Sequence, residues 1–109
     1  MPTVTLDQAL DQLPKVELHC HLEGTMRPAT VLELAARHGV ALPTTDLDEL
    51  YRYHSLDTFL AVFWLVQSCL GDRADWARLA YESAVDAAAH GRVYAECFFT
   101  PARHLAAGQ

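Results

Sequence analysis

The sequence predicts an α/β fold that contains two parallel strands. Two short runs rich in apolar residues, Val16–His21 and Val93–Thr100, have the length and composition of buried strands. The chain between them carries several amphipathic helical patterns and no hairpin signal. Strands joined through helices pair in parallel by a right-handed crossover, and this arrangement begins an α/β fold.

Helical patterns lie on both sides of the first strand. Thr5 is a predicted N-cap for a short helix over Leu6–Leu13. After the first strand, Gly24 is expected to let the backbone turn. A helix then runs over Pro28–His38, because proline is favoured at the first helical position and Gly39 is a helix stop.

The middle of the chain predicts two more helices. Asp46 and Glu49 have the spacing of a capping box, which predicts a brief helix that continues through Tyr51. Ser55 caps the clearest helical pattern in the sequence, which ends at Leu70 and repeats its apolar residues at i, i+3, i+4 and i+7. This pattern predicts a helix with one wide apolar face.

A long helix leads to the second strand. Either Asp72 or Asp75 begins it, and His90 with Gly91 ends it. Its small-residue face is expected to pack against the sheet. No element is predicted over residues 102–109.

The composition excludes some classes of partner. The formal net charge is −6, and the eight Lys and Arg residues are scattered singly, so a nucleic-acid backbone would be repelled. The longest apolar run, Phe59–Val66, is too short to span a bilayer, and no signal peptide opens the chain. A cytoplasmic protein without a membrane or nucleic-acid partner is expected, and Cys20, Cys69 and Cys97 are predicted to be reduced, buried and structural.

The feature that predicts chemistry is a His-x-His pair at the end of the first strand. Side chains alternate along a strand, so His19 and His21 project from one face and Cys20 from the other. Two imidazoles on one face are able to bind one metal ion. Jelly-roll metal proteins also use this pattern but are rich in strands, and the zinc cytidine deaminases need a Pro-Cys-x-x-Cys motif that this sequence lacks.

The other four histidines are expected to be structural. His38 and His90 stand beside glycines at predicted helix ends, where an imidazolium complements the helix dipole. His54 and His104 fall in predicted loops and are expected at the surface.

Residues 13–28, Leu-Pro-Lys-Val-Glu-Leu-His-Cys-His-Leu-Glu-Gly-Thr-Met-Arg-Pro, resemble the first strand of the adenosine/adenine deaminase family. The resemblance continues through Leu42-Pro43, Ser55–Leu60, Ala80–Glu82 and Val93–Glu96, so it covers nearly the whole chain. It implies a zinc-dependent metallo-hydrolase with a (β/α)₈ barrel. Residues 1–109 would be the incomplete amino-terminal segment of that single domain, with its first two strands and their helices.

The resemblance also implies an activity, hydrolytic deamination of adenosine or deoxyadenosine in purine nucleotide metabolism. His19 and His21 would be two ligands of Zn²⁺, and Glu23 would contact the purine nucleoside on its sugar side. An apolar wall of the substrate site would come from Leu56, Phe59, Leu60 and Phe63. The general acid, the general base and the remaining zinc ligands would lie beyond this segment, which alone would be inactive.

Three alternatives remain at this stage. Glu at position 23 is frequent in relatives that act on the free base, so adenine is the first alternative substrate. A non-catalytic fragment that pairs with a complementary chain is the second. Another barrel hydrolase acting on a non-purine amide is the third, although it leaves the matches outside the histidine motif unexplained. The oligomeric state is not predicted.

Overall fold

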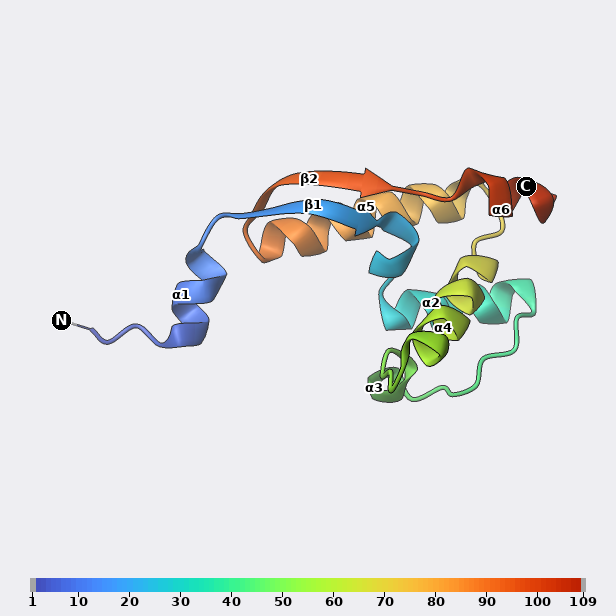
Figure 1. The fold of residues 1–109 in the computed structure, drawn as a ribbon, viewed down its shortest axis with the longest axis horizontal. Helices are drawn as coiled ribbons and strands as arrows, with labels where there is room; N and C mark the ends of the chain where they lie inside the picture. Colours follow the sequence, from blue (N-terminus) through green and yellow to red (C-terminus); the bar gives the residue numbers. More distant parts are fainter. Residues whose placement is uncertain (1, 109) are drawn as a thin grey trace.

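The structure is a computed structural model that describes residues 2–108. Residues 1 and 109, the two end positions of the predicted segment, lie outside the described residues. The molecule is elongated, 57 × 27 × 25 Å, with one helix projecting at its amino-terminal end (Figure 1). Its elements are α1 (Leu6–Gln12), β1 (Lys15–His21), the 3₁₀ helix η1 (Leu22–Thr25), α2 (Pro28–His38), α3 (Leu47–Leu50), α4 (Leu56–Ser68), α5 (Arg73–Ala89), β2 (Arg92–Phe98) and α6 (Pro101–Ala106).

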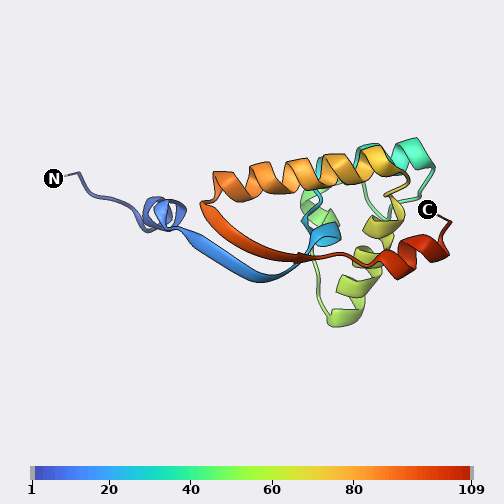
Figure 2. The same ribbon diagram turned by 90° about the horizontal axis from the view of Figure 1, so that it is seen from above.

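The two strands pair in parallel, which confirms the predicted α/β arrangement. At the carboxyl end of the sheet, Cys20 pairs with Cys97 and His21 with Phe98, after a register irregularity between Glu17 and Cys20. Helix α5 runs along one face of both strands and turns directly into β2 (Figures 1 and 2). The carboxyl ends of β1 and β2 therefore lie next to each other.

The predicted helix starts are confirmed by their caps. The Thr5 and Ser55 hydroxyls each accept a hydrogen bond from the backbone N–H three residues on, and the Asp72 carboxylate does the same. In each case the third helical side chain bonds back to the cap, which completes a capping box. Asp46 caps α3 differently, because its carboxylate accepts from the N–H of Asp48.

The end of the chain differs from the prediction. Strand β2 ends at Phe98 rather than Thr100, and Pro101–Ala106 forms helix α6, where no element was predicted. Proline at the first helical position carries no N–H that the helix would leave unpaired, and its fixed φ suits a helix start. Pro101 therefore starts a helix in addition to ending the strand.

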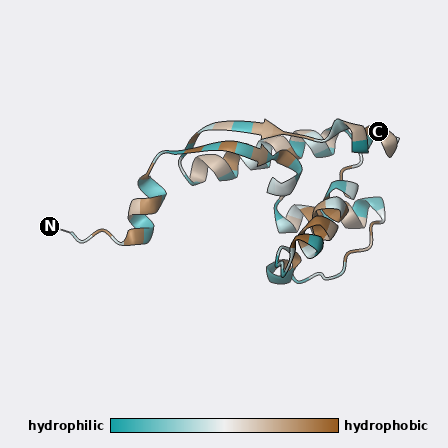
Figure 3. Cartoon of the chain, viewed as in Figure 1, coloured by the Kyte–Doolittle hydropathy of each residue, from teal (hydrophilic) through white to brown (hydrophobic). Residues whose placement is uncertain are grey.

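The hydrophobic core lies among the helices. It is formed where η1, α2, α3, α4 and α5 meet, from Met26, Val31, Leu34, Ala35, Leu50, Val66, Cys69, Leu70 and Leu79, each at most 2% exposed. Helix α4 brings the longest run of apolar residues to this region (Figure 3). In the strands, by contrast, Cys20 is the one buried residue.

An ionic network around the buried Glu82 and Thr30 fastens α2 to α5. Glu82 accepts hydrogen bonds from Thr30 at 2.8 and 2.9 Å and from Arg78 at 2.6 Å, and Arg27 forms an ion pair with Asp86. Burial alone would raise the pKa of Glu82, but the bonds from Arg78 and Thr30 outweigh it and lower that pKa. The network fixes the start of α2, and with it the turn that follows the first strand.

Among residues 2–108, none of the helices combines the length and the apolar character that a membrane span requires.

Candidate metal and ligand site

The two histidines of β1 converge on one point. The Nε2 atoms of His19 and His21 lie 3.1 Å apart, and their ring centroids are 5.1 Å apart. Both residues are exposed. The structure thus brings the two predicted ligands together on one face at the carboxyl end of the strand, where parallel α/β folds place their functional groups.

The turn after the pair lies where it was predicted, but it does not use a left-handed glycine. Residues Leu22–Thr25 make a 3₁₀ helix, in which the Thr25 hydroxyl donates to the carbonyl of Leu22 at 2.7 Å. Gly24 does not have a positive φ, so the left-handed freedom of glycine is not what makes the turn. A Cβ at Gly24 would lie 3.5 Å from the ring of Phe63, which is an ordinary van der Waals contact, so the approach of α4 does not require a glycine here.

Aromatic rings surround the imidazoles. Phe98 of β2 has its ring centroid 4.8 Å from that of His19, and Phe63 of α4 meets His21 edge-on at 5.9 Å. Phe59 stacks on Phe63 at 5.8 Å with nearly parallel planes. The imidazoles therefore face an apolar wall that belongs to two different elements.

The α4 part of this wall lines a hollow of about 500 Å³, whereas Phe98 is not among its lining residues. Three of the four predicted wall residues line it, Phe59, Leu60 and Phe63. The fourth, Leu56, is 69% exposed and is not among the lining residues. Trp64 also lines the hollow, and the Arg103 guanidinium of α6 lies 4.4 Å from its ring centroid. Sequence reasoning missed Trp64, although it directly follows Phe63.

Glu23 is turned into the protein. Its residue has 0% exposed surface, and its Oε1 accepts a hydrogen bond of 2.7 Å from the N–H of Thr100. The Nε2 of His104 lies 3.4 Å from the same oxygen. Oε2 has no hydrogen-bond partner among the described residues. A ligand would reach this oxygen only after neighbouring side chains moved.

The geometry of the histidine pair fits a zinc ion. Zinc–imidazole bonds are about 2.0–2.1 Å long, so two nitrogens at a tetrahedral angle lie about 3.3 Å apart. The observed 3.1 Å between the Nε2 atoms is close to this separation. Within residues 2–108, no carboxylate is hydrogen-bonded to either ring, so the pair supplies two ligands of an incomplete set.

A second group of possible metal ligands is committed to helix capping. His38, Asp72 and Asp75 bring their ligand atoms within 4.8 Å of one another. However, Asp75 Oδ2 accepts from His38 and from the N–H of Gly71, and Arg37 forms ion pairs with both carboxylates. A cation here would compete with the Arg37 guanidinium, so this group serves to hold the end of α2 against the start of α5.

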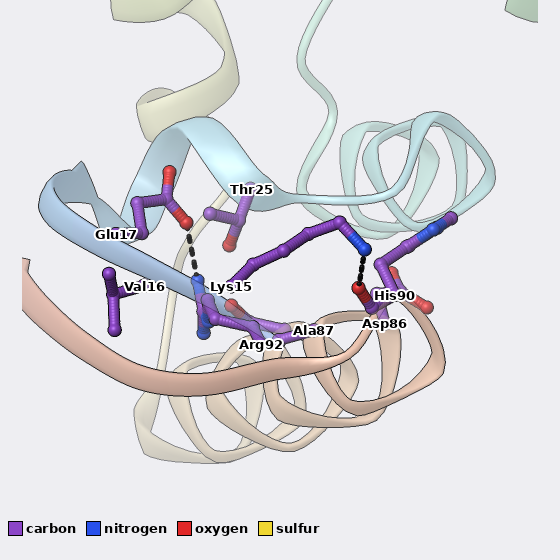
Figure 4. A pocket seen from close by; sticks show the side chains of 9 residues that line it. Lys15, Val16, Glu17, Thr25, Asp86, Ala87, His90 and Arg92 are labelled. Atoms are coloured by element: carbon purple, nitrogen blue, oxygen red, sulfur yellow. Dashed lines mark hydrogen bonds and ion pairs between the residues drawn. The ribbon is translucent and has the colours of Figure 1, made fainter. Parts of the chain in front are cut away.

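Another hollow lies toward the amino end of the strands and is structural (Figure 4). The Lys15 ammonium donates to the carbonyls of Leu10, Leu13 and His90, which joins α1 to the turn after α5. Beside it, Arg92 pairs with Glu17 at 2.8 Å. Both cations are satisfied by groups of the chain itself.

Two predictions were wrong, the surface position of His104 and the burial of Cys97. His54 is exposed, as expected, but His104 lies on α6 and is 7% exposed rather than at the surface. Cys20 and Cys69 are buried and Cys97 is exposed. Burial and the neighbouring Glu17 raise the pKa of the Cys20 thiol, which keeps it protonated and unreactive.

Solved structures share this architecture. Adenine deaminase from Arthrobacter aurescens superposes with a TM-score of 0.75 and 33% sequence identity, over 87% of this chain and 30% of that one. An amidohydrolase from Burkholderia ambifaria, solved with bound Zn, gives a TM-score of 0.71 and 36% identity, over 92% of this chain and 29% of that one. The fold described above is therefore part of a (β/α)₈ barrel.

Curated relatives match along the same region. Adenine deaminase of Streptomyces coelicolor is 45% identical over 103 residues, and aminodeoxyfutalosine deaminase of Acidothermus cellulolyticus is 41% identical over 103 residues. Each match covers 92% of this chain, but only 30% and 29% of the respective relative. Adenosine deaminase of Clostridium botulinum is 35% identical over 104 residues, which is 89% of this chain and 31% of that relative.

The family model described as adenosine deaminase matches residues 14–109, which include both histidines, the aromatic wall and Glu23. The match confirms the resemblance seen in the strand motif. This chain therefore belongs to the adenosine deaminase family, of hydrolytic deaminases, and spans about 30% of the length of its relatives.

Proposed function

We propose that this chain supplies half of the zinc site and one apolar wall of a deaminase that converts adenosine or deoxyadenosine to inosine or deoxyinosine and ammonia. The observation that carries the proposal is the 3.1 Å convergence of the His19 and His21 Nε2 atoms beside the rings of Phe63 and Phe98. A purine ring is flat and apolar on its faces, so aromatic side chains suit it.

In this proposal each residue has a limited task. His19 and His21 hold the zinc ion, which when bound lowers the pKa of a coordinated water toward 7. Phe59, Leu60 and Phe63 exclude bulk water from one side of the purine. Glu23 would offer Oε2 to a donor on the sugar side of the ligand once the side chains that bury it have moved. Leu56 stands outside the hollow and would contribute to the wall only through a movement of α4.

The segment alone is proposed to be inactive. Two imidazoles leave the metal without a third ligand from the pair, and Glu17, the carboxylate that lines the same hollow, is paired with Arg92 at 2.8 Å. The remaining zinc ligands, the general acid and the general base would come from the remaining length of the family barrel. A non-catalytic fragment that pairs with a complementary chain is the alternative, and an in-frame continuation of the coding region would rule it out.

Adenine is a second candidate substrate. The carboxylate of Glu23 is bound to Thr100 and has no exposed surface, which favours a ligand without a ribose hydroxyl at this point. Relatives named adenine deaminase support the same candidate. A cytoplasmic location and the lack of membrane and nucleic-acid partners stay predictions of the sequence.

The deciding experiment measures ammonia release by the full-length gene product with adenosine, deoxyadenosine and adenine, before and after treatment with a chelator. We expect release from at least one purine, loss of it on chelation and recovery on adding zinc. If the zinc-loaded protein releases ammonia from none of the three, the purine assignment is wrong.

A further inference from the structure

A group of three buried polar side chains includes Glu23, which stands two residues after His21. It contains the carboxylate of Glu23, which is 0% exposed, the side chain of Gln67 at 1% and the imidazole of His104 at 7%. Gln67 and His104 line a common hollow between α4 and α6. The cluster joins η1, α4 and α6, which are far apart in the sequence.

His104 is held from two sides. Its Nε2 lies 3.4 Å from Glu23 Oε1, and its ring meets the indole of Trp76 edge-on with centroids 4.6 Å apart. The same Glu23 oxygen accepts the N–H of Thr100 at 2.7 Å. The imidazole is unable to swing away without losing the contacts with both Glu23 and Trp76.

Burying these polar side chains costs more free energy than apolar side chains would at the same positions. A buried carboxylate is unfavourable unless its oxygens are fully hydrogen-bonded. Here one oxygen carries both contacts, while Glu23 Oε2 and both amide atoms of Gln67 have no partner within residues 2–108. A leucine or methionine would fill the position of Glu23 without that cost, so its carboxylate points to a task beyond stability.

The hydrogen bond from the Thr100 N–H to Glu23 connects the ends of the two strands. Glu23 stands two residues after His21, and Thr100 stands two residues after Phe98, the ring that faces His19. Pro101 has no N–H, so the Thr100 N–H is the last free main-chain donor before α6 begins. The bond from Thr100 to Glu23 therefore sets where Phe98 stands relative to the histidines.

We propose that His104 is a positioning residue for ligand binding: with Glu23 and the Thr100 N–H it forms a buried clamp that holds Phe98 in place beside His19 and His21. The inference rests on the proposed function, because Phe98 is taken to act on ligand binding through the histidine beside which its ring lies. His104 itself touches neither the metal pair nor the hollow beside it.

The test compares two replacements of His104 in the full-length gene product. Gln keeps an N–H donor near the place of Nε2, whereas Leu fills a similar volume without a donor. We expect His104→Leu to raise amide exchange over residues 99–105 by about tenfold and KM for adenosine by about tenfold, with kcat changed less than about twofold. His104→Gln should restore both values to near those of the wild type.

Two further variants complete the design. His54→Leu changes an exposed histidine of the loop before α4 and should alter neither exchange nor KM. If His104→Leu does not fold, Glu23→Gln keeps the acceptor oxygen but removes its charge, and exchange over residues 99–105 should still rise by about threefold.

Unchanged exchange in His104→Leu would overturn the clamp. Raised exchange with unchanged KM would overturn the positioning role and leave a purely structural contact. If the wild-type protein deaminates no purine, the proposed function has failed by itself, and the exchange measurements still decide whether the clamp exists.

Discussion

The helical half of this chain closes its core, whereas its sheet leaves apolar side chains open. Leu34 and Leu79 among the helices are 1% exposed, while Val16, Leu18 and Val93 in the strands are 62–71% exposed. One face of the sheet is covered by α5, and among the described residues no third strand pairs with the outer strand edges (Figure 2).

The difference shows which half depends on further structure. Helices bury their apolar stripes against neighbours that are close in the sequence, so α2 to α5 are able to form a core within this segment. A parallel strand needs a layer on each face and a neighbour on each edge. The candidate site lies on this open half. The sheet lacks further strands and the site lacks further ligands for the same reason, since this chain spans about 30% of the length of its relatives.

The largest expected effect is at the metal pair. Replacing His19 or His21 with Ala in the full-length gene product should remove zinc binding and lower kcat/KM by about a thousandfold, because metal catalysis supplies several kcal/mol to the transition state. Metal content and ammonia release are measured together, and His54→Ala is the exposed control. Zinc bound at full occupancy with full activity in either variant would contradict the assignment.

The next effect separates the two halves directly. Leu34→Ala should lower the free energy of unfolding by about 3 kcal/mol in the 109-residue chain and in a chain of the family's full length, because this core is already closed. Leu18→Ala should cost less than about 0.5 kcal/mol in the 109-residue chain, and about 2 kcal/mol or more in the longer one.

Urea denaturation of the four proteins measures these values. An equal cost of Leu18→Ala in the short and the long chain would show that the open face of β1 stays uncovered, and the comparison of the two halves would then be wrong.

Acid should weaken the helical half through Asp75. Burial alone would raise its pKa, but hydrogen bonds from the N–H groups of Gly71 and Asp72 and from His38 outweigh it and hold the pKa below its usual value. A carboxyl group with a lowered folded-state pKa stabilises the protein above its unfolded pKa, near 3.9, and this stability is lost as the pH falls through the folded-state value.

Asp75→Asn should therefore lower stability at neutral pH by about 2 kcal/mol and flatten the decline of stability below about pH 4. Thermal unfolding from pH 7 to pH 3 measures both effects, with the exposed Asp11→Asn as control. An acid decline that is equally steep in Asp75→Asn and in the wild type would contradict the role of this carboxylate.

Local signals predicted most of the fold. The caps at Thr5, Ser55 and Asp72 fixed three helix starts because each satisfies backbone donors within three residues of itself. Helix α6 was not predicted, because Pro101 was interpreted as the end of the strand and not also as the first residue of a helix. The turn at Gly24 lies where it was predicted, but it forms as a 3₁₀ helix in which this glycine has no positive φ.

The site was predictable where it depends on strand periodicity or on the family motif. Alternation alone put His19 and His21 on one face, and the family resemblance selected Phe59, Leu60 and Phe63. The burial of His104 was not predictable, because it depends on contacts with Glu23 and Trp76, which are 81 and 28 positions away in the chain. Such contacts leave no periodic pattern in a single sequence.

The smallest expected effect tests what Glu23 does at the boundary between the two halves. Aspartate is shorter by one methylene, so its carboxylate is unable to keep the 2.7 Å bond to the Thr100 N–H without a shift of the backbone. Glu23→Asp in the full-length gene product should change the ratio of kcat/KM for adenosine over adenine by about tenfold, with kcat on the better substrate changed less than about threefold.

Steady-state ammonia release with both purines measures the ratio, and Glu49→Asp, on the exposed side of α3, serves as the matched control. Since the deleted methylene lies in a buried contact, the change should act on ligand discrimination before it acts on the chemical step. A ratio equal to that of the wild type would mean that the Glu23 carboxylate holds the loop at Thr100 but has no influence on which purine binds.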